Sequence, residues 1–223
     1  FKQKTAYEIM PSLVGSEMCI RDRTGVELHV CHVSTEGGVE LIKRAKKENV
    51  SITCETCPHY LFLTFKDLIE KGTLAKMGPP LRSKKNQIAL WRGILDGSVD
   101  ILASDHAPHT LEEKEQDIWS APAGVPGVET TLRLMLNAVN KRMITLRKLV
   151  ELMHDNPVKR FDLKNYGYIQ KGNSANLTIV DLKERWKISR DDLLTKCGWS
   201  PFEGWKGKGL PTSVIINGEF IGF

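Results

Sequence analysis

Two residues that commonly bind metals each stand where an apolar run of strand length ends. His32 lies near the end of the segment 26–33, and Asp105 closely follows the segment 99–102. Parallel strands of a barrel or an open sheet gather their carboxyl ends on one rim, so we expect the two side chains to share a site. A neutral imidazole and a carboxylate are good zinc ligands, and catalytic zinc keeps one position open for water. The pattern therefore predicts a metal-dependent hydrolase.

The same residues also have simpler interpretations. His32 fits a hydrogen-bonded core histidine, and Asp105 fits a helix cap. Cys54 and Cys57 have the spacing of half a zinc site or of a redox pair, but no second cysteine pair lies at a suitable distance. Two thiols at the end of a strand are the favoured interpretation of that pair. Periodicity assigns no role to His29.

Strands and helices alternate along the first half of the sequence. Strands are expected at 26–33, 50–54 and 99–102, and helices at 36–48, 65–71 and 84–97, with caps at Ser34-Thr35 and Ser83. This alternation predicts right-handed βαβ units and a parallel sheet. The later sequence predicts helices at 127–140, at 146–153 after Thr145 and from 156, then strands at 167–171 and 177–181, and a hairpin at 214–220 around Asn217-Gly218.

Composition narrows the class of protein. The 223 residues carry a formal charge of +5 that is spread along the chain, which argues against nucleic-acid binding. No apolar run reaches the roughly 18 residues of a membrane span. The five cysteines are an odd number without framework spacing and indicate a reducing compartment. We therefore expect a cytoplasmic, soluble protein.

The first 23 residues do not fit the pattern that follows. Residues 1–23 show no clean helical or strand period, and the stretch 12–23 resembles translated sequencing-adaptor read-through. We expect this segment to be a non-native leader and exclude it from the fold prediction. A genuine surface helix is the alternative.

Several motifs together resemble one enzyme family. Ala-Ser-Asp-His-Ala-Pro-His at 103–109, followed after four residues by Lys114, resembles the signature of the dihydroorotases of the amidohydrolase superfamily. Supporting segments lie at 32–35, 55–61, 79–82, 124–130 and 200–204, and the resemblance covers about residues 25–223. The pieces at 32–34 and 79–82 are shared with hydantoinases and allantoinases. Those enzymes, and a non-catalytic dihydroorotase-like scaffold, remain alternatives.

The resemblance implies an α/β fold. Residues 24–162 would form part of a TIM-like (β/α)8 barrel, about strands 6 to 8, and residues 163–223 part of a small β-sandwich. The implied reaction is the zinc-dependent, reversible hydrolysis of dihydroorotate to N-carbamoyl-L-aspartate in pyrimidine biosynthesis. Implied partners are the small-molecule substrate and either further copies of the chain or other enzymes of the pathway, with neither nucleic acid nor membrane.

The resemblance also assigns roles to individual residues. His32 and Asp105 would bind one or two zinc ions, and Asp105 would also act as general base. His109 would contact the substrate carboxylate, and the backbone at Ala123 and Gly124 would bind the ring.

Two departures from the family pattern stand out. Gly78 occupies the position of an asparagine whose side chain would bind the substrate, so the identity of the substrate stays open. A closed barrel needs eight strands and catalytic zinc about three protein ligands, whereas three βα units and two ligands are found here. We expect the remaining ligands before Thr24, and we expect the isolated chain to be inactive with an exposed barrel edge.

Overall fold

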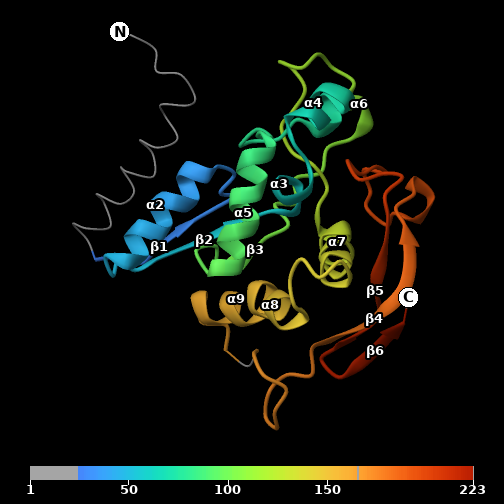
Figure 1. Ribbon diagram of the computed structural model, residues 1–223. Coiled ribbons are helices and arrows are strands. Elements are labelled where there is room, and N and C mark those ends of the chain that lie inside the picture. The colour runs from blue at the N-terminus through green and yellow to red at the C-terminus, as the bar shows by residue number, and fades with distance from the viewer. Residues whose placement is uncertain (1–24, 165, 223) are drawn as a thin grey trace. The chain divides into compact units, whose positions relative to one another are not determined.

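The computed structural model describes residues 25–164 and 166–222 (Figure 1). The described residues divide into two compact units, the first comprising 25–64 and 81–103, and the second 65–80, 104–164 and 166–222. The expected leader at 1–23 lies outside the described residues. Among the helices of the described ranges, none has both the length and the apolar character to cross a bilayer.

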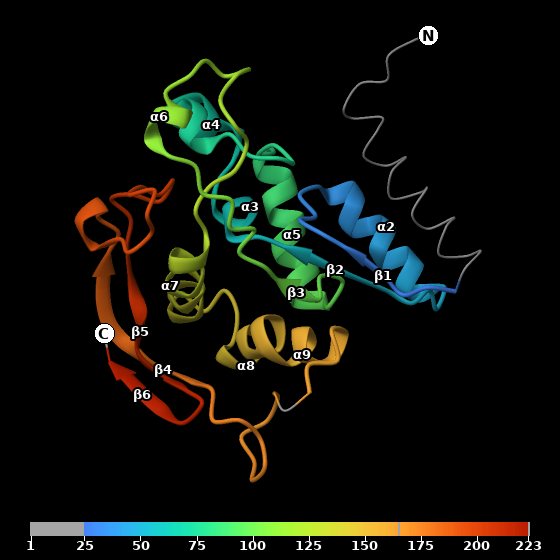
Figure 2. The same cartoon turned by 180° about the vertical axis from the view of Figure 1, so that it is seen from behind.

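The first unit is built on a parallel three-stranded sheet. The strands β1 (Leu28–Val30), β2 (Ile52–Thr56) and β3 (Ile101–Leu102) pair in the order β1-β2-β3. Its helices are α2 (Glu36–Lys47), α3 (Pro58–Phe62) and α5 (Lys84–Asp96). Figures 1 and 2 show α2 and α5 side by side along this sheet. The predicted α/β class and the parallel pairing are confirmed.

The two long helices of this unit begin in different ways. At the start of α2 the Thr35 hydroxyl accepts a hydrogen bond from the Gly38 amide at 3.1 Å, which is the expected N-cap. Ser83 stands at the corresponding position before α5, but its hydroxyl accepts from the Asn86 side chain at 3.0 Å and makes no bond to the helix backbone. The expected boundary of α5 is therefore correct, while the expected cap bond is not formed.

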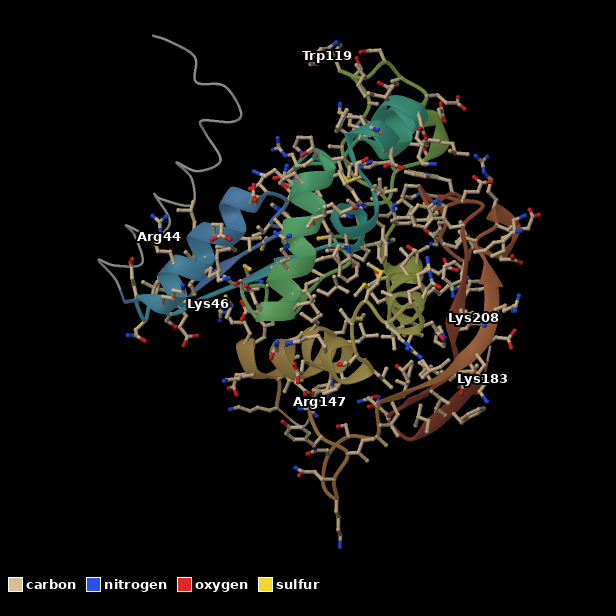
Figure 3. The ribbon with its side chains drawn as sticks, in the orientation of Figure 1. Arg44, Lys46, Trp119, Arg147, Lys183 and Lys208 are labelled. Atoms are coloured by element: carbon tan, nitrogen blue, oxygen red, sulfur yellow. The ribbon has the colours of Figure 1, made fainter. Side chains whose placement is uncertain are left out.

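A partly buried network ties α2 to the sheet. The Lys46 ammonium donates to both carboxylate oxygens of Asp100 at 2.7 Å, and Asp100 accepts the Cys54 amide at 2.8 Å. Figure 3 marks Lys46 on α2. The Cys54 thiol donates to the Ser98 carbonyl, and burial raises its pKa to about 12. Such a thiol is unreactive, which agrees with a structural interpretation of Cys54.

The second unit combines short helices with an antiparallel sheet. Its helical segments are α4 (Phe65–Lys71), a 3-10 turn (Gly72–Ala75), α6 (Leu111–Lys114), α7 (Val128–Asn140), α8 (Leu146–Val150), a π-helical turn (Glu151–Asp155), α9 (Asn156–Arg160) and a 3-10 turn (Arg190–Asp192). The strands β4 (Leu177–Lys187), β5 (Lys206–Ile216) and β6 (Glu219–Gly222) pair in chain order. Asn217 and Gly218, with φ of 51° and 89°, form the expected tight turn between β5 and β6.

Close packing in this unit depends on a glycine of β5. Figure 2 shows α7 beside β5. A Cβ on Gly209 would stand 2.5 Å from the Cβ of Leu136 on α7. The Trp186 indole of β4 donates to the Gly209 carbonyl at 2.8 Å, and both Trp186 and Leu136 are buried. The sheet and α7 therefore share one core.

The expected strand at 167–171 is wrong. This segment consists of bends and turns. The Gly167 carbonyl accepts from the His154 ring at 2.7 Å, the Tyr168 carbonyl accepts from the Asn173 side chain at 2.8 Å, and Gly167 has a φ of 130°. Backbone groups that a strand would pair are thus bonded to side chains instead. The expected division at residue 162 into barrel part and β-sandwich part stays a prediction.

Candidate active site

Potential metal-binding side chains of the first unit follow its parallel strands. His32 comes two residues after β1, and His59 lies in the first turn of α3, three residues after β2. The His59 side chain is buried with 2% exposure. Burial and, to a smaller extent, the nearby His32 lower its pKa to about 3. His59 is therefore a neutral imidazole near His32, in the protonation state that binds metals.

Sequence patterns alone assign no role to His59, which lies within the motif segment 55–61. Pro58 is nevertheless a usable signal. Proline is favoured at the first position of a helix, so a helix starting at Pro58 places His59 directly beyond the strand end.

Both predicted metal ligands have an uncommon backbone conformation. His32 has a φ of 38° and Asp105 a φ of 46°. Within the described part of the chain, four other non-glycine residues have positive φ: Asn49, Arg142, Asp162 and Asn217. Left-handed conformations cost about 1 to 3 kcal/mol outside glycine and concentrate at functional sites. His32 belongs to the first unit and Asp105 to the second. Their joint binding of one ion stays a prediction.

All four predicted substrate-binding positions lie together within the second unit. The His109 ring makes a hydrogen bond to the Ala123 carbonyl at 3.2 Å and lies beside Gly124. A Cβ on Gly78 would stand 3.9 Å from the Cβ of Ala123. The structure therefore brings Gly78, His109, Ala123 and Gly124 into one cluster, which we call the glycine cradle.

Gly124 shapes the centre of the glycine cradle. Its φ is 136°, and a Cβ there would lie 2.7 Å from both the Cβ and the carbonyl oxygen of Ala107. Its amide donates to the Lys76 carbonyl at 3.0 Å. Glycine is required because no other residue combines this conformation with such a close approach.

The buried side chain of Lys114 stabilises the glycine cradle by hydrogen bonds. Its side chain is 1% exposed, and its ammonium donates to the carbonyls of Lys76 and Pro122 at 3.2 and 2.8 Å. Burial, together with a smaller contribution from the charge of Lys76, lowers its pKa to about 8. The Trp199 ring lies 5.7 Å from the ammonium, and its indole N–H donates to the His109 carbonyl at 2.7 Å. Lys114 thus joins the two backbone segments that carry Gly78 and Gly124.

The second histidine of the motif has a structural role. His106 Nδ1 accepts the Gly127 amide at 3.1 Å, immediately before α7. A Cβ on Gly127 would collide with the Ser104 carbonyl oxygen. This hydrogen bond occupies Nδ1 of His106. It also orients the chain next to Asp105.

The available donors suit a divalent metal ion. The first unit offers the imidazoles of His32 and of the neutral His59, and the second unit offers the carboxylate of Asp105. Imidazole nitrogen and carboxylate oxygen are the ligands of catalytic zinc sites. The residue types therefore fit zinc.

Comparison with known proteins identifies the family. The model described as "Amidohydrolase family" matches residues 12–221, and the chain belongs to this family. The chain is similar to the dihydroorotase of Pyrococcus furiosus, with 49% identity over 193 residues that cover 86% of this chain and 44% of the relative. For the dihydroorotase of Bacillus cytotoxicus the identity is 38%, covering 99% of this chain and 53% of the relative. The chain therefore spans about half the length of the curated relatives it matches.

Solved structures give the same family context. The L-hydantoinase (dihydropyrimidinase) of Arthrobacter aurescens matches with a TM-score of 0.91 and 34% identity, over 98% of this chain and 49% of that chain. The inactive dihydroorotase-like domain of the Chaetomium thermophilum CAD-like multifunctional protein matches with a TM-score of 0.73 and 22% identity, over 98% and 56%. The second likeness shows the fold alone. Together they support a TIM-barrel-like α/β fold.

Proposed function

We propose that this chain supplies the carboxyl-terminal part of a dihydroorotase, about barrel strands 6 to 8 and part of the β-sandwich. The dihydroorotases matched at 38% and 49% identity support this assignment. The single observation that carries it is the left-handed backbone of His32 and Asp105, with φ of 38° and 46°. Strain at two potential ligands, each shortly after a parallel strand, is expected where a site fixes their side chains.

The proposed reaction is the reversible hydrolysis of the cyclic amide of dihydroorotate. His32 and Asp105 would bind zinc, as one or two ions, and the neutral His59 lies near His32. When bound, zinc supplies a Lewis acid and lowers the pKa of a bound water towards about 7. Asp105 accepts the proton of the attacking water and passes it to the ring nitrogen as the carbon–nitrogen bond breaks. One carboxylate thereby acts as base and then as acid.

The glycine cradle would bind the rest of the substrate. His109 would contact the substrate carboxylate, and the backbone at Ala123 and Gly124 would contact the ring. Lys114 fixes both cradle segments through the carbonyls of Lys76 and Pro122, so the substrate groups meet a preformed surface. Preformed donors and acceptors need no rearrangement during the reaction.

Turnover by a completed enzyme tests the proposal. The chain is joined to the amino-terminal half encoded at the same genomic locus, purified with zinc and assayed for dihydroorotate hydrolysis. We expect turnover that falls at least about 100-fold in Asp105→Asn, because general base catalysis contributes about that much or more. His154→Asn, which changes a histidine bonded to the Gly167 carbonyl outside the proposed site, is the control. Zinc-loaded enzyme without turnover of dihydroorotate would refute the assignment.

A related cyclic amide is the second candidate substrate. Gly78 lacks the side chain expected at this position in dihydroorotases, and the Arthrobacter aurescens L-hydantoinase is 34% identical in the matched region. Assay of the completed enzyme with dihydroorotate, hydantoin and allantoin distinguishes the candidates. Turnover of hydantoin or allantoin without turnover of dihydroorotate would identify the second candidate.

Partners and compartment follow from the same proposal. We propose a cytoplasmic enzyme, supported by the odd number of cysteines without framework spacing. Its partners would be other copies of the chain or other enzymes of pyrimidine biosynthesis. Size measurement of the completed enzyme, alone and mixed with those enzymes, tests this.

A further inference from the structure

Four polar side chains form a compact patch on one face of β1 and β2. His29 pairs in register with Thr53, and Val30 with Cys54, so Cys31 and Glu55 follow as the next neighbours. Successive side chains of a strand point to opposite faces, which puts His29, Cys31, Thr53 and Glu55 on the same face. The intervening residues Val30 and Cys54 are buried on the other face. We call the four-residue set the β1–β2 patch.

Three members of the β1–β2 patch offer different ligand atoms close together. A ring nitrogen of His29, the sulfur of Cys31 and a carboxylate oxygen of Glu55 all lie within 4.8 Å of one another. Zinc binds nitrogen and oxygen at about 2.0 Å and thiolate at about 2.3 Å, so tetrahedral ligands stand about 3.3 to 3.8 Å apart. The His29 Nε2 to Glu55 oxygen distance of 3.1 Å is already close to this range, and the sulfur of Cys31 lies within 4.8 Å of both atoms.

The hydrogen bonds of His29 prepare its ring for a metal. Nδ1 lies 2.8 Å from the Thr53 hydroxyl, and Nε2 lies 3.1 Å from a Glu55 oxygen. An unprotonated Nε2 and a carboxylate oxygen are both acceptors, so at 3.1 Å a proton or a cation must lie between them. Without metal, the Nε2–H of His29 donates to Glu55. Threonine can both donate and accept, so Thr53 accepts the Nδ1–H once Nε2 binds a metal. A bond that orients the second ring nitrogen is typical of metal-binding histidines.

Exposure within the patch allows an ion to enter. The His29 and Glu55 side chains are 10% and 16% exposed, while Cys31 is exposed. Cys31 is the soft ligand, and its thiol loses a proton to solvent on binding. The three protein atoms leave a fourth tetrahedral position for water.

We propose that His29, Cys31 and Glu55 bind a thiophilic divalent cation such as zinc, oriented by Thr53 and separate from the site at His32 and Asp105. The bound ion cross-links β1 to β2 on the face opposite the buried Val30 and Cys54. This site uses none of the residues assigned to the proposed reaction. Its existence can therefore be tested without any enzymatic activity.

Cobalt spectroscopy of the full 223-residue chain tests the proposal. Co²⁺ is titrated into reduced protein, and the near-ultraviolet charge-transfer band from thiolate to cobalt is recorded. We expect a band that saturates and that zinc abolishes by competition. Cys31→Ser removes the band, and because Cys31 is exposed this substitution leaves the fold intact, as far-ultraviolet circular dichroism would verify. Cys197→Ser, in the second unit, is the matched control that keeps the band.

Thr53 provides a second measurement with graded variants. Thr53→Val removes the partner of His29 Nδ1 and is expected to weaken Co²⁺ binding at least about 10-fold, whereas Thr53→Ser keeps the hydroxyl and the affinity. A band that persists in Cys31→Ser, or that disappears only in Cys57→Ser, would overturn the proposal. Absence of any band in the unsubstituted chain would overturn it as well.

Discussion

The first unit presents donor side chains at and along its parallel strands, whereas the glycine cradle of the second unit presents mainly backbone groups. His32, His59 and the β1–β2 patch offer nitrogen, sulfur and oxygen atoms at the ends and on one face of parallel strands. The glycine cradle offers the backbone around Ala123 and Gly124, fixed by Lys114. Side-chain donors depend on their own atoms and on the few groups that orient them. A backbone surface depends instead on residues that never touch the ligand.

Replacing Gly124 by alanine should produce the largest change and tests this contrast most directly. The new Cβ would lie 2.7 Å from Ala107 and would force a φ of 136° on alanine. We expect the free energy of unfolding, measured in urea, to fall at least about 2 kcal/mol further than in Gly172→Ala. Gly172 has a φ of 100° and open space around its Cβ position. The control variant Gly172→Ala therefore has the backbone strain of a positive φ but no steric clash. Equal losses in the two variants would contradict a tightly packed cradle.

This contrast also explains what the sequence could predict. The parallel strands, α2, α7 and the hairpin follow from local periodicity and turn residues, and most of their expected bounds are close to the observed ones. His32 and Asp105 are predicted ligands because of their residue types and their positions after strands, and this stays a prediction. The strand at 167–171 failed because side chains of His154 and Asn173 bind its carbonyls, and no local pattern encodes such bonds.

The glycine cradle was accessible only through the family resemblance. Its hydrogen bonds join residues far apart in sequence, such as Lys76 with Gly124 and Lys114 with Pro122. Composition and periodicity indicate which faces of a helix or strand are apolar. They do not indicate where another residue approaches the backbone so closely that only glycine fits. The β1–β2 patch differs from the cradle in this respect. The alternation of side chains along a strand is enough to place His29 and Cys31 on one face. Only the register with Thr53 and Glu55 had to come from the structure.

Lys114 gives the second unit a pH dependence of its stability. Burial lowers its pKa from 10.5 to about 8, so between these values the unfolded chain keeps a proton that the folded chain has lost. Stability therefore rises as the pH increases from about 8 to 10.5. The neutral amine keeps two N–H groups for the carbonyls of Lys76 and Pro122, so deprotonation removes the cost of a buried charge without losing a bond.

Urea unfolding across this pH range measures the effect of Lys114. We expect the rise in stability to be absent from Lys114→Met, which fills the same space without a titrating group. Lys208→Met, at a surface lysine of β5 marked in Figure 3, should keep the rise. A rise of equal size in Lys114→Met would assign the pH dependence to other groups.

Lys46 and Lys43 on α2 allow a smaller test of side-chain networks in the first unit. Lys46 donates to Asp100 and to the carbonyls of Gly97 and Ser98 and is partly buried. Lys43 bonds Asp96 in a more exposed position. We expect Lys46→Met to lower the free energy of unfolding by about 1 to 2 kcal/mol, because it leaves partly buried acceptors without their donor. Lys43→Met should change it within experimental error, since exposed ion pairs contribute little. Equal losses of stability in the two variants would show that the difference in burial does not determine how much each ion pair contributes.

Gly78 is the position where the cradle has room for a side chain, and its replacement should have the smallest effect on stability. A Cβ at Gly78 would meet only the Cβ of Ala123 at 3.9 Å, an ordinary contact. We therefore expect Gly78→Asn to change the free energy of unfolding by no more than about 0.5 kcal/mol. In the completed enzyme the new amide would face the proposed substrate site and add a hydrogen bond. The kcat/KM for dihydroorotate should then rise relative to that for hydantoin, by about 5-fold for one neutral hydrogen bond. A destabilised variant would mean that the cradle is closed at Gly78, and an unchanged substrate ratio would mean that this position does not face the substrate.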